Sequence, residues 1–300
     1  MSIASYLKSF KIQPQKTFLL GVGAQKSGTS WLYRYFRERK DSAMGFTKEY
    51  HVFDTRTLEY FHCKREQAEA KLMPTQNEKV SCKQKKHAQL LLEFMDNPVA
   101  YYDYFTNLLD TSKAYITADF SPSYSALSIT TLSEIKSEFS HRGIRVFPIF
   151  LMREPVDRLR SMVKMNFRNS GIVPDREQEL EAMRKLCGTK ADQLRSSYNF
   201  TYENLCTVFG ETKFVSFYET LFHEPEIRRL CQQLELEYTQ PDFAIKENPS
   251  PSAHIFSASD VDQMRTHYQA QYDFAEETFG KEFIDSIWKQ SYLDNFKSHT

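Results

Sequence analysis

The chain has 300 residues, 41% of them hydrophobic, which is enough to form the core of one α/β domain. Lys and Arg number 39 and Asp and Glu also number 39, so no net charge attracts a nucleic acid or a membrane surface, and we expect neither as a partner. Residues 1–17 contain no apolar run of signal-peptide length, and no later window approaches about 18 uninterrupted apolar residues, so we expect a soluble protein without a membrane anchor.

The first predicted element follows a short N-terminal arm, residues 1–16, and opens a single domain that we expect to span residues 17–300. Residues 18–22 (FLLGV) form an apolar run that predicts a buried strand. A turn spaced by Gly23 and Gly28 comes next, and a helical pattern follows at once. Such a turn presents backbone N–H groups and the positive end of a helix dipole to one point, which is typical of a phosphate site.

The two glycines have the spacing of the P-loop, G-x-x-x-x-G-K-[ST], but the lysine does not follow that motif. Thr29 stands where a nucleoside triphosphatase places its lysine, and the lysine of this turn is Lys26. This position indicates a nucleotide held at its 5′-phosphate, with the cation directed at the bond to a transferred group. A strand-turn-helix without a ligand is the alternative.

Residues 26–31 (KSGTSW) resemble the 5′-phosphosulfate-binding loop of sulfotransferases, whose donor is 3′-phosphoadenosine 5′-phosphosulfate (PAPS). The resemblance implies a P-loop-like α/β fold, with a central parallel sheet flanked by helices. It implies PAPS as the donor substrate and adenosine 3′,5′-bisphosphate as the product. It also implies that the donor contacts are made by Lys26, Ser27, Gly28, Thr29, Ser30 and Trp31.

Residues 46–54 predict a brief extended piece in which Glu49 and His51 share a face, since alternate residues of an extended segment point the same way. Such a pair can accept a proton from a hydroxyl or an amine. The segment resembles the K-E-x-H-x-F-D stretch of the heparan sulfate sulfotransferases, the Golgi-type carbohydrate enzymes with the closest motifs. That resemblance implies Glu49 as the catalytic base, supported by His51 and Asp54, although Tyr50 replaces the usual small residue or proline. A solvated loop is the alternative.

Residues 62–97 form a polar insertion rich in lysine, and most such runs are solvated helix faces. The alternative is a cap on the acceptor side whose lysines attract an anionic substrate. Residues 115–124 then predict a strand that ends at a turn with Pro122. They resemble the G-E-[KA]-[ST]-P-x-Y segment at the substrate cleft of the same family, with Asp119 in place of Glu and Phe120 where several glycosaminoglycan enzymes have Lys.

Residues 145–152 predict a central parallel strand, in which Pro148 indicates either a bulge or a strand that begins after it. A strand that ends in Arg153 and is followed by Ser161 brings a guanidinium and a hydroxyl within reach of one anion. This R-x-P-x-x-R-x-x-S run resembles the 3′-phosphate motif of sulfotransferases. The resemblance implies that Arg153 and Ser161 bind the donor, and we expect Arg158 to brace the motif by an internal ion pair.

Residues 213–221 predict a further strand and resemble the family's V-x-x-Y-E-D-L stretch, which makes Tyr218 a neighbour of the adenine. Residues 246–254 take the position of the flap over the nucleotide, and we assign no role to any of them. The five cysteines include no C-x-x-C pair, and the eight histidines do not accompany them at metal-ligand spacing. We therefore expect a reducing, cytoplasmic compartment and no metal.

These patterns together predict a PAPS-dependent sulfotransferase that acts on a carbohydrate or on a small hydroxylated molecule. In-line transfer requires positioning, a base and a cation at the leaving phosphate, and Glu49 and Lys26 supply the last two. A P-loop nucleotide kinase is the main alternative, disfavoured by Thr29 and by the absence of a convincing magnesium carboxylate after a strand. A nucleotide-binding module without catalysis is the third. The acceptor, O- versus N-sulfation and the oligomeric state stay open.

Overall fold

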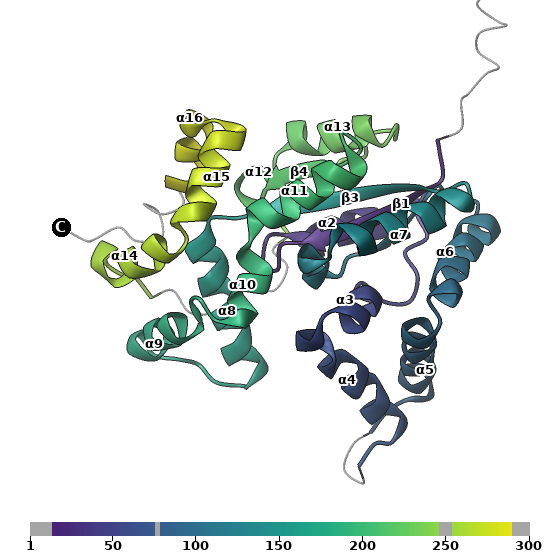
Figure 1. Ribbon diagram of the computed structural model, residues 1–300, viewed down its shortest axis with the longest axis horizontal. Helices are drawn as coiled ribbons and strands as arrows, with labels where there is room; N and C mark the ends of the chain where they lie inside the picture. Colours follow the sequence, from purple (N-terminus) through teal and green to yellow (C-terminus); the bar gives the residue numbers. More distant parts are fainter. Residues whose placement is uncertain (1–13, 76–78, 246–253, 290–300) are drawn as a thin grey trace, which may run out of the picture.

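The computed structural model of the protein describes residues 14–75, 79–245 and 254–289. A four-stranded parallel sheet in the order β2-β1-β3-β4 forms the centre of this part of the chain (Figure 1). Its strands are β1 (Thr17–Gly23), β2 (Ile116–Asp119), β3 (Arg145–Met152) and β4 (Phe214–Phe217). The predicted α/β class with a parallel sheet flanked by helices is therefore confirmed.

Both faces of the sheet are buried, because side chains alternate along each strand and each face meets its own layer of helices. Leu19 and Leu151 belong to one apolar core, and Leu20 and Phe150 belong to the other. The first core is covered by α2 (Thr29–Arg37) and α13 (Glu224–Gln233), and the second by α6 (Pro98–Ser112), α7 (Ile129–His141) and α11 (Tyr198–Phe209).

Pro148 neither starts nor bulges β3, contrary to the expectation from the sequence. The strand runs through this residue, which lies opposite Leu20, and the register shift lies in β1, between Gly21 and Gly23. Pairing of β3 with β4 begins only at Ile149. Pro148 therefore sits where no ladder with β4 has begun, and no hydrogen bond to that strand is lost by its missing N–H.

The polar insertion folds as a helical hairpin, α4 (Cys63–Leu72) and α5 (Cys82–Asp96), which lies with α3 (Val52–Thr57) and α6 to one side of the sheet (Figure 1). Helix α5 starts where Ser81 and Gln84 form a capping box. The remaining elements are α8 (Pro155–Asn169), α9 (Arg176–Leu186), α10 (Lys190–Ser196), α12 (Tyr218–Leu221), α14 (Ala258–His267), α15 (Gln269–Phe279), α16 (Lys281–Ile284), η1 (Glu59–Phe61), η2 (Pro122–Ala126) and η3 (Asp285–Lys289).

Most of the expected N-terminal arm, residues 1–13, lies outside the described residues, and so does nearly all of the expected flap, residues 246–253. The expected domain boundaries stay a prediction. Among the helices that the structure describes, none has the length and apolar character needed to cross a membrane.

Candidate functional site

The turn between β1 and α2 has the geometry of an anion site. Gly28 is the N-cap of α2 and adopts a left-handed conformation with φ 89°, and a Cβ at this position would lie 2.7 Å from Leu221 Cδ2. No side chain caps the helix, and its first turn holds no acidic residue. The first N–H groups of α2 and the positive end of its dipole are therefore available to an anion, because no side chain of α2 or its cap already binds them.

Lys26 stands in this turn with φ 72°, a backbone conformation that is rare for a residue with a side chain. Its side chain is partly buried, and burial, together with the positive charges of Arg168, Arg153 and Lys48, lowers its pKa to about 8. So many cations around one half-buried lysine make the charged state costly until an anion binds.

Arg153 follows β3 and joins the turn directly. Its Nη1 atom donates to the backbone carbonyl of Lys26 at 3.2 Å, and its guanidinium lies 4.2 Å from the centre of the Tyr218 ring. The same tyrosine adjoins Gly28, since a Cβ on that glycine would lie 3.4 Å from Tyr218 Cδ2. The structure thus brings together three predicted donor segments, which follow β1, β3 and β4 at the carboxyl edge of the sheet.

The remaining residues of the second donor motif lie on α8. Ser161 is half-buried, in the second turn of the helix. Arg158 is fully buried and forms an ion pair with Asp192 of α10, which confirms the predicted internal ion pair. Arg158 therefore fastens α8 to α10.

Three polar or aromatic side chains of the donor loop differ in where they point. Thr29 and Ser30 face Lys48, whose Nζ donates to their hydroxyls at 3.4 and 2.9 Å. The indole of Trp31 is instead buried in the core, stacked on Phe243 with ring centres 5.8 Å apart. Its part in donor binding, expected from the motif, would have to come from its backbone, because the ring is used in packing.

Glu49 and His51 meet as predicted, but not in an extended segment. His51 adopts a left-handed conformation with φ 53°, and α3 begins directly after it. His51 Nε2 lies 3.2 Å from Glu49 Oε2, and Nδ1 lies 2.7 Å from Asp54 Oδ2. The expectation that a brief extended piece continues through His51 was wrong, because the chain turns into α3 at this residue and brings Asp54 back onto the imidazole. The three predicted members of the base cluster are therefore in contact.

The cluster carries a charge pair at neutral pH. Burial opposes ionisation of Glu49, but hydrogen bonding from His51 and the charge of Lys48 outweigh it and lower the pKa of Glu49 to about 2. Burial likewise disfavours charged His51, yet its hydrogen bonds to Asp54 and Glu49 raise its pKa to about 9. Glu49 is then an ionised acceptor, whereas His51 is an imidazolium that has no free position for a proton.

Lys48 is a site residue that the sequence reasoning left without a role. Its Nζ donates to Glu49 Oε1 at 2.9 Å while also reaching the donor-loop hydroxyls of Thr29 and Ser30. It therefore bridges the predicted donor loop and the predicted base. The sequence shows this lysine as the first residue of K-E-x-H. The direction in which its side chain points, however, depends on how this segment packs against the donor loop.

The end of β2 and the turn that follows it support the predicted base cluster through hydrogen bonds. The Asp119 side chain is fully buried, and burial raises its pKa to about 6. It accepts a hydrogen bond from Ser121 at 2.6 Å, and the Ser121 hydroxyl accepts from the backbone N–H groups of Tyr50 and His51 at 3.0 and 3.1 Å. Ser123 adds a contact of 3.1 Å to His51 Nδ1. Asp119, which stands where the family has Glu, therefore uses its oxygens in hydrogen bonds inside the protein.

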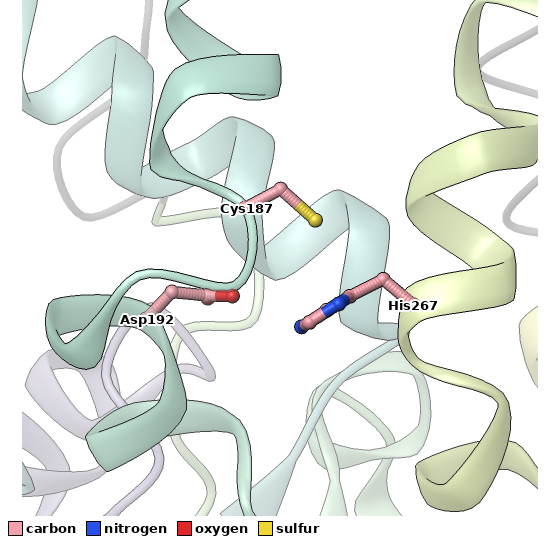
Figure 2. Close-up of side chains that lie close together, drawn as sticks. All are labelled: Cys187, Asp192 and His267. Atoms are coloured by element: carbon pink, nitrogen blue, oxygen red, sulfur yellow. The ribbon is translucent and has the colours of Figure 1, made fainter.

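One group of metal-ligand side chains comes together in the described part of the chain, Cys187, Asp192 and His267, with ligand atoms within 4.8 Å of one another (Figure 2). Both carboxylate oxygens of Asp192 already accept hydrogen bonds: Oδ1 from Arg158, and Oδ2 from the Tyr268 hydroxyl at 2.6 Å. Burial raises the pKa of the Cys187 thiol to about 11, which disfavours the thiolate that binds metals. The group fits a structural network around Arg158 better than a metal centre.

No family model and no curated protein matches the chain. Its structure is similar to a sulfotransferase from Alicyclobacillus acidocaldarius, with a TM-score of 0.52 and 18% identity over 88% of this chain and 95% of that one. It also resembles the sulfotransferase domain of the Synechococcus olefin synthase (TM-score 0.41, 17% identity, 74% of each chain) and a Mycobacterium avium sulfotransferase (TM-score 0.41, 10% identity, 90% of this chain and 80% of that one). The first similarity shows that the chain has the sulfotransferase fold, as the loop motif predicted.

Proposed function

We propose that the protein is a sulfotransferase that moves a sulfuryl group from PAPS to a hydroxyl or amine of a carbohydrate or a small hydroxylated molecule. The observation that carries the proposal is the contact of Lys26 with Arg153, made at 3.2 Å between the carbonyl of one and the guanidinium of the other. These residues belong to the two motifs that the sequence assigned to one donor. The sulfotransferase fold supports the same assignment.

The residues present fit the two charged ends of such a donor. The uncapped start of α2 and the ammonium of Lys26 suit the 5′-phosphosulfate, and Arg153 with Ser161 suits the 3′-phosphate. Ser27 Oγ and Arg153 Nε are buried without a hydrogen-bond partner among the described residues. Buried polar atoms of this kind are normally satisfied, and a nucleotide phosphate would supply acceptors for both.

The chemistry of the donor is an activated sulfuryl group on a phosphate that can leave. Lys26 offers a cation for the charge that develops on the leaving oxygen. Glu49 accepts the acceptor's proton, His51 holds the Glu49 carboxylate in place, and Asp54 in turn holds His51. Lys48, through its contacts with Ser30 and Glu49, keeps the base at a fixed position relative to the donor loop.

We propose in addition that the α4–α5 hairpin lies on the acceptor side. Helix α3, which carries Asp54, packs on α5, and Arg56 donates to the Met95 carbonyl of α5 at 2.6 Å. The charge of Lys64 on α4 is near enough to His51 to oppose its protonation. A lysine of the hairpin thus acts electrostatically on the base cluster, which supports a role in attracting an anionic acceptor.

Calorimetry with adenosine 3′,5′-bisphosphate and with ATP tests the donor assignment. We expect the bisphosphate to bind far more tightly, because only this nucleotide fills both phosphate positions. The Arg153→Ala change should weaken its binding by about 2–4 kcal/mol, whereas Arg228→Ala, on the exposed side of α13, should leave it unchanged. Equal or tighter binding of ATP would contradict the proposal.

Mass spectrometry of candidate acceptors, after their incubation with the protein and PAPS, then identifies the acceptor substrate.

A further inference from the structure

The peptide group between Arg153 and Glu154 is held from both sides. The Tyr198 hydroxyl donates to the Arg153 carbonyl at 2.8 Å, and the Glu154 N–H donates to Glu219 Oε1 at 2.9 Å. A trans peptide has one donor and one acceptor, and here both are bound by side chains from distant parts of the sequence. The backbone from which the Arg153 side chain projects is thereby fixed.

Each partner of this peptide is itself firmly placed. Tyr198 begins α11, is 1% exposed, and its backbone N–H donates to Gln271 Oε1 of α15 at 2.8 Å. Glu219 follows Tyr218, whose ring lies beneath the Arg153 guanidinium. The residue that holds the peptide and the residue that supports the guanidinium are therefore neighbours at the end of β4.

Glu154 closes the arrangement as the N-cap of α8. One of its carboxylate oxygens accepts from the Asp157 N–H at 2.6 Å, and the other accepts from the Tyr272 hydroxyl. Among the described residues, by contrast, the Arg153 side chain makes one hydrogen bond, to a backbone carbonyl, and its Nε is buried without a partner. The orientation of the Arg153 guanidinium therefore depends on the backbone from which it projects and on its contact with the Tyr218 ring.

We infer that Glu219 is a positioning residue which, by accepting the Glu154 N–H, aims Arg153 at the 3′-phosphate and so makes the site selective for nucleotides that carry this phosphate. The inference rests on the proposed function, in which Arg153 binds the 3′-phosphate of the donor. Tyr198 has the same role on the opposite side of the peptide.

The interaction requires an oxygen acceptor and not a negative charge. Burial raises the pKa of Glu219 to about 7, so its carboxyl is partly protonated at neutral pH while the other oxygen still accepts the N–H. A glutamine at this position retains the acceptor oxygen, and an alanine does not. The two substitutions therefore separate the hydrogen bond from the charge of Glu219.

The test is the ratio of affinities for adenosine 3′,5′-bisphosphate and adenosine 5′-phosphate, measured by calorimetry on the full chain. In the wild type this ratio should be large. Glu219→Ala should lower it by about tenfold, the effect of one lost hydrogen bond, while the affinity for adenosine 5′-phosphate stays the same. Glu219→Gln should keep the wild-type ratio, and Glu219→Ala should have no further effect on it in an Arg153→Ala background.

A folded Glu219→Ala protein with the wild-type ratio would overturn the inference while leaving the proposed function intact. A wild-type ratio near one would instead overturn the proposed function and the inference with it. If Glu219→Ala does not fold, Tyr198→Phe decides: it removes the hydroxyl and keeps the ring, and it should also lower the ratio. Tyr202→Phe is its matched control, because the Tyr202 ring packs on Phe274 and Phe279 of α15.

Discussion

The imidazole of His51 lies with Nε2 3.2 Å from Glu49 Oε2, so that a charged histidine is paired with the predicted base. The pKa of His51 is raised to about 9 and that of Glu49 is lowered to about 2. Between these values the pair is an imidazolium and a carboxylate. A proton leaving an acceptor hydroxyl then has an open place on Glu49 and none on His51, which favours the carboxylate as the base.

Replacing Glu49 by Gln should lower kcat by about 10²–10⁴, the usual contribution of a positioned base, because the amide keeps the shape but cannot take the proton. The affinity for adenosine 3′,5′-bisphosphate should hardly change, since the proposed function places Glu49 on the acceptor side. Both are measured once the mass-spectrometric screen has supplied an acceptor. Near-normal kcat in Glu49→Gln together with loss of turnover in His51→Gln would move the base to the histidine.

The pH dependence of kcat separates the same two residues without mutation. A carboxylate whose pKa is about 2 stays ionised down to low pH, so kcat at saturating donor should be flat between pH 7 and pH 5. A histidine base with a pKa of about 9 would instead be protonated across this range, and kcat would fall about tenfold for each unit of decreasing pH. A decline of that size on the acid side contradicts the assignment to Glu49.

The convergence of the residues that we assign to the donor could be predicted, because their positions are set by local chain geometry. Gly28 and Lys26 occupy a turn whose position follows from the strand before it and the helix after it, and Arg153 directly follows a strand in the same way. Parallel strands end at one edge of the sheet, so the sequence order was sufficient to bring these residues together.

The residues that we assign to the base cluster could be predicted only as a set, not in their geometry. The left-handed conformation of His51 depends on Ser121, which lies 70 positions further along the chain and binds its N–H at 3.1 Å. Lys48 is turned toward Ser30 by the packing of its segment beside the end of β2, where the Phe120 N–H donates to the Lys48 carbonyl at 2.8 Å. Such contacts arise from tertiary packing, which periodicity and spacing do not encode.

Lys26 should make donor binding weaken on the alkaline side of neutrality. Burial and the neighbouring cations lower its pKa to about 8, so it is mostly charged at pH 7 and mostly neutral at pH 9. An anion binds the charged form, and the affinity for adenosine 3′,5′-bisphosphate should therefore drop by about tenfold between these values. Constant affinity of the wild type over this range would contradict the assignment of Lys26.

The Lys26→Arg variant is the control for this titration, because a guanidinium stays charged throughout. Any pH dependence that persists in this variant belongs to other groups, among them Glu219, with a pKa of about 7.

The Lys26→Ala variant should lower kcat by about 10²–10³, the effect of losing one donor at a developing oxyanion, with a smaller loss in bisphosphate binding. Equal losses in both would show that Lys26 acts only in the ground state.

The buried pair of Arg158 and Asp192 should support stability and not donor recognition. Both side chains are fully buried, and the Asp192 carboxylate also accepts from Tyr268 and from the Gly188 N–H. Removing the guanidinium in Arg158→Met leaves the carboxylate without its counter-charge in the interior. The free energy of unfolding, measured with urea, should then fall by about 3–5 kcal/mol. The exposed pair of Arg228 and Glu224 provides the control, since Arg228→Met should change the free energy of unfolding by less than about 0.5 kcal/mol.

Binding of adenosine 3′,5′-bisphosphate by the folded Arg158→Met protein decides between a bracing residue and a phosphate ligand. Because the Arg158 side chain is turned into α10 and away from solvent, we expect its affinity to stay within about threefold of the wild type, less than the effect of one lost hydrogen bond. A loss as large as that of Arg153→Ala, with an unfolding free energy close to the wild-type value, would show that Arg158 contacts the nucleotide. Phosphate binding within the R-x-P-x-x-R-x-x-S motif would then have to be assigned to Arg158 as well as, or in place of, Arg153.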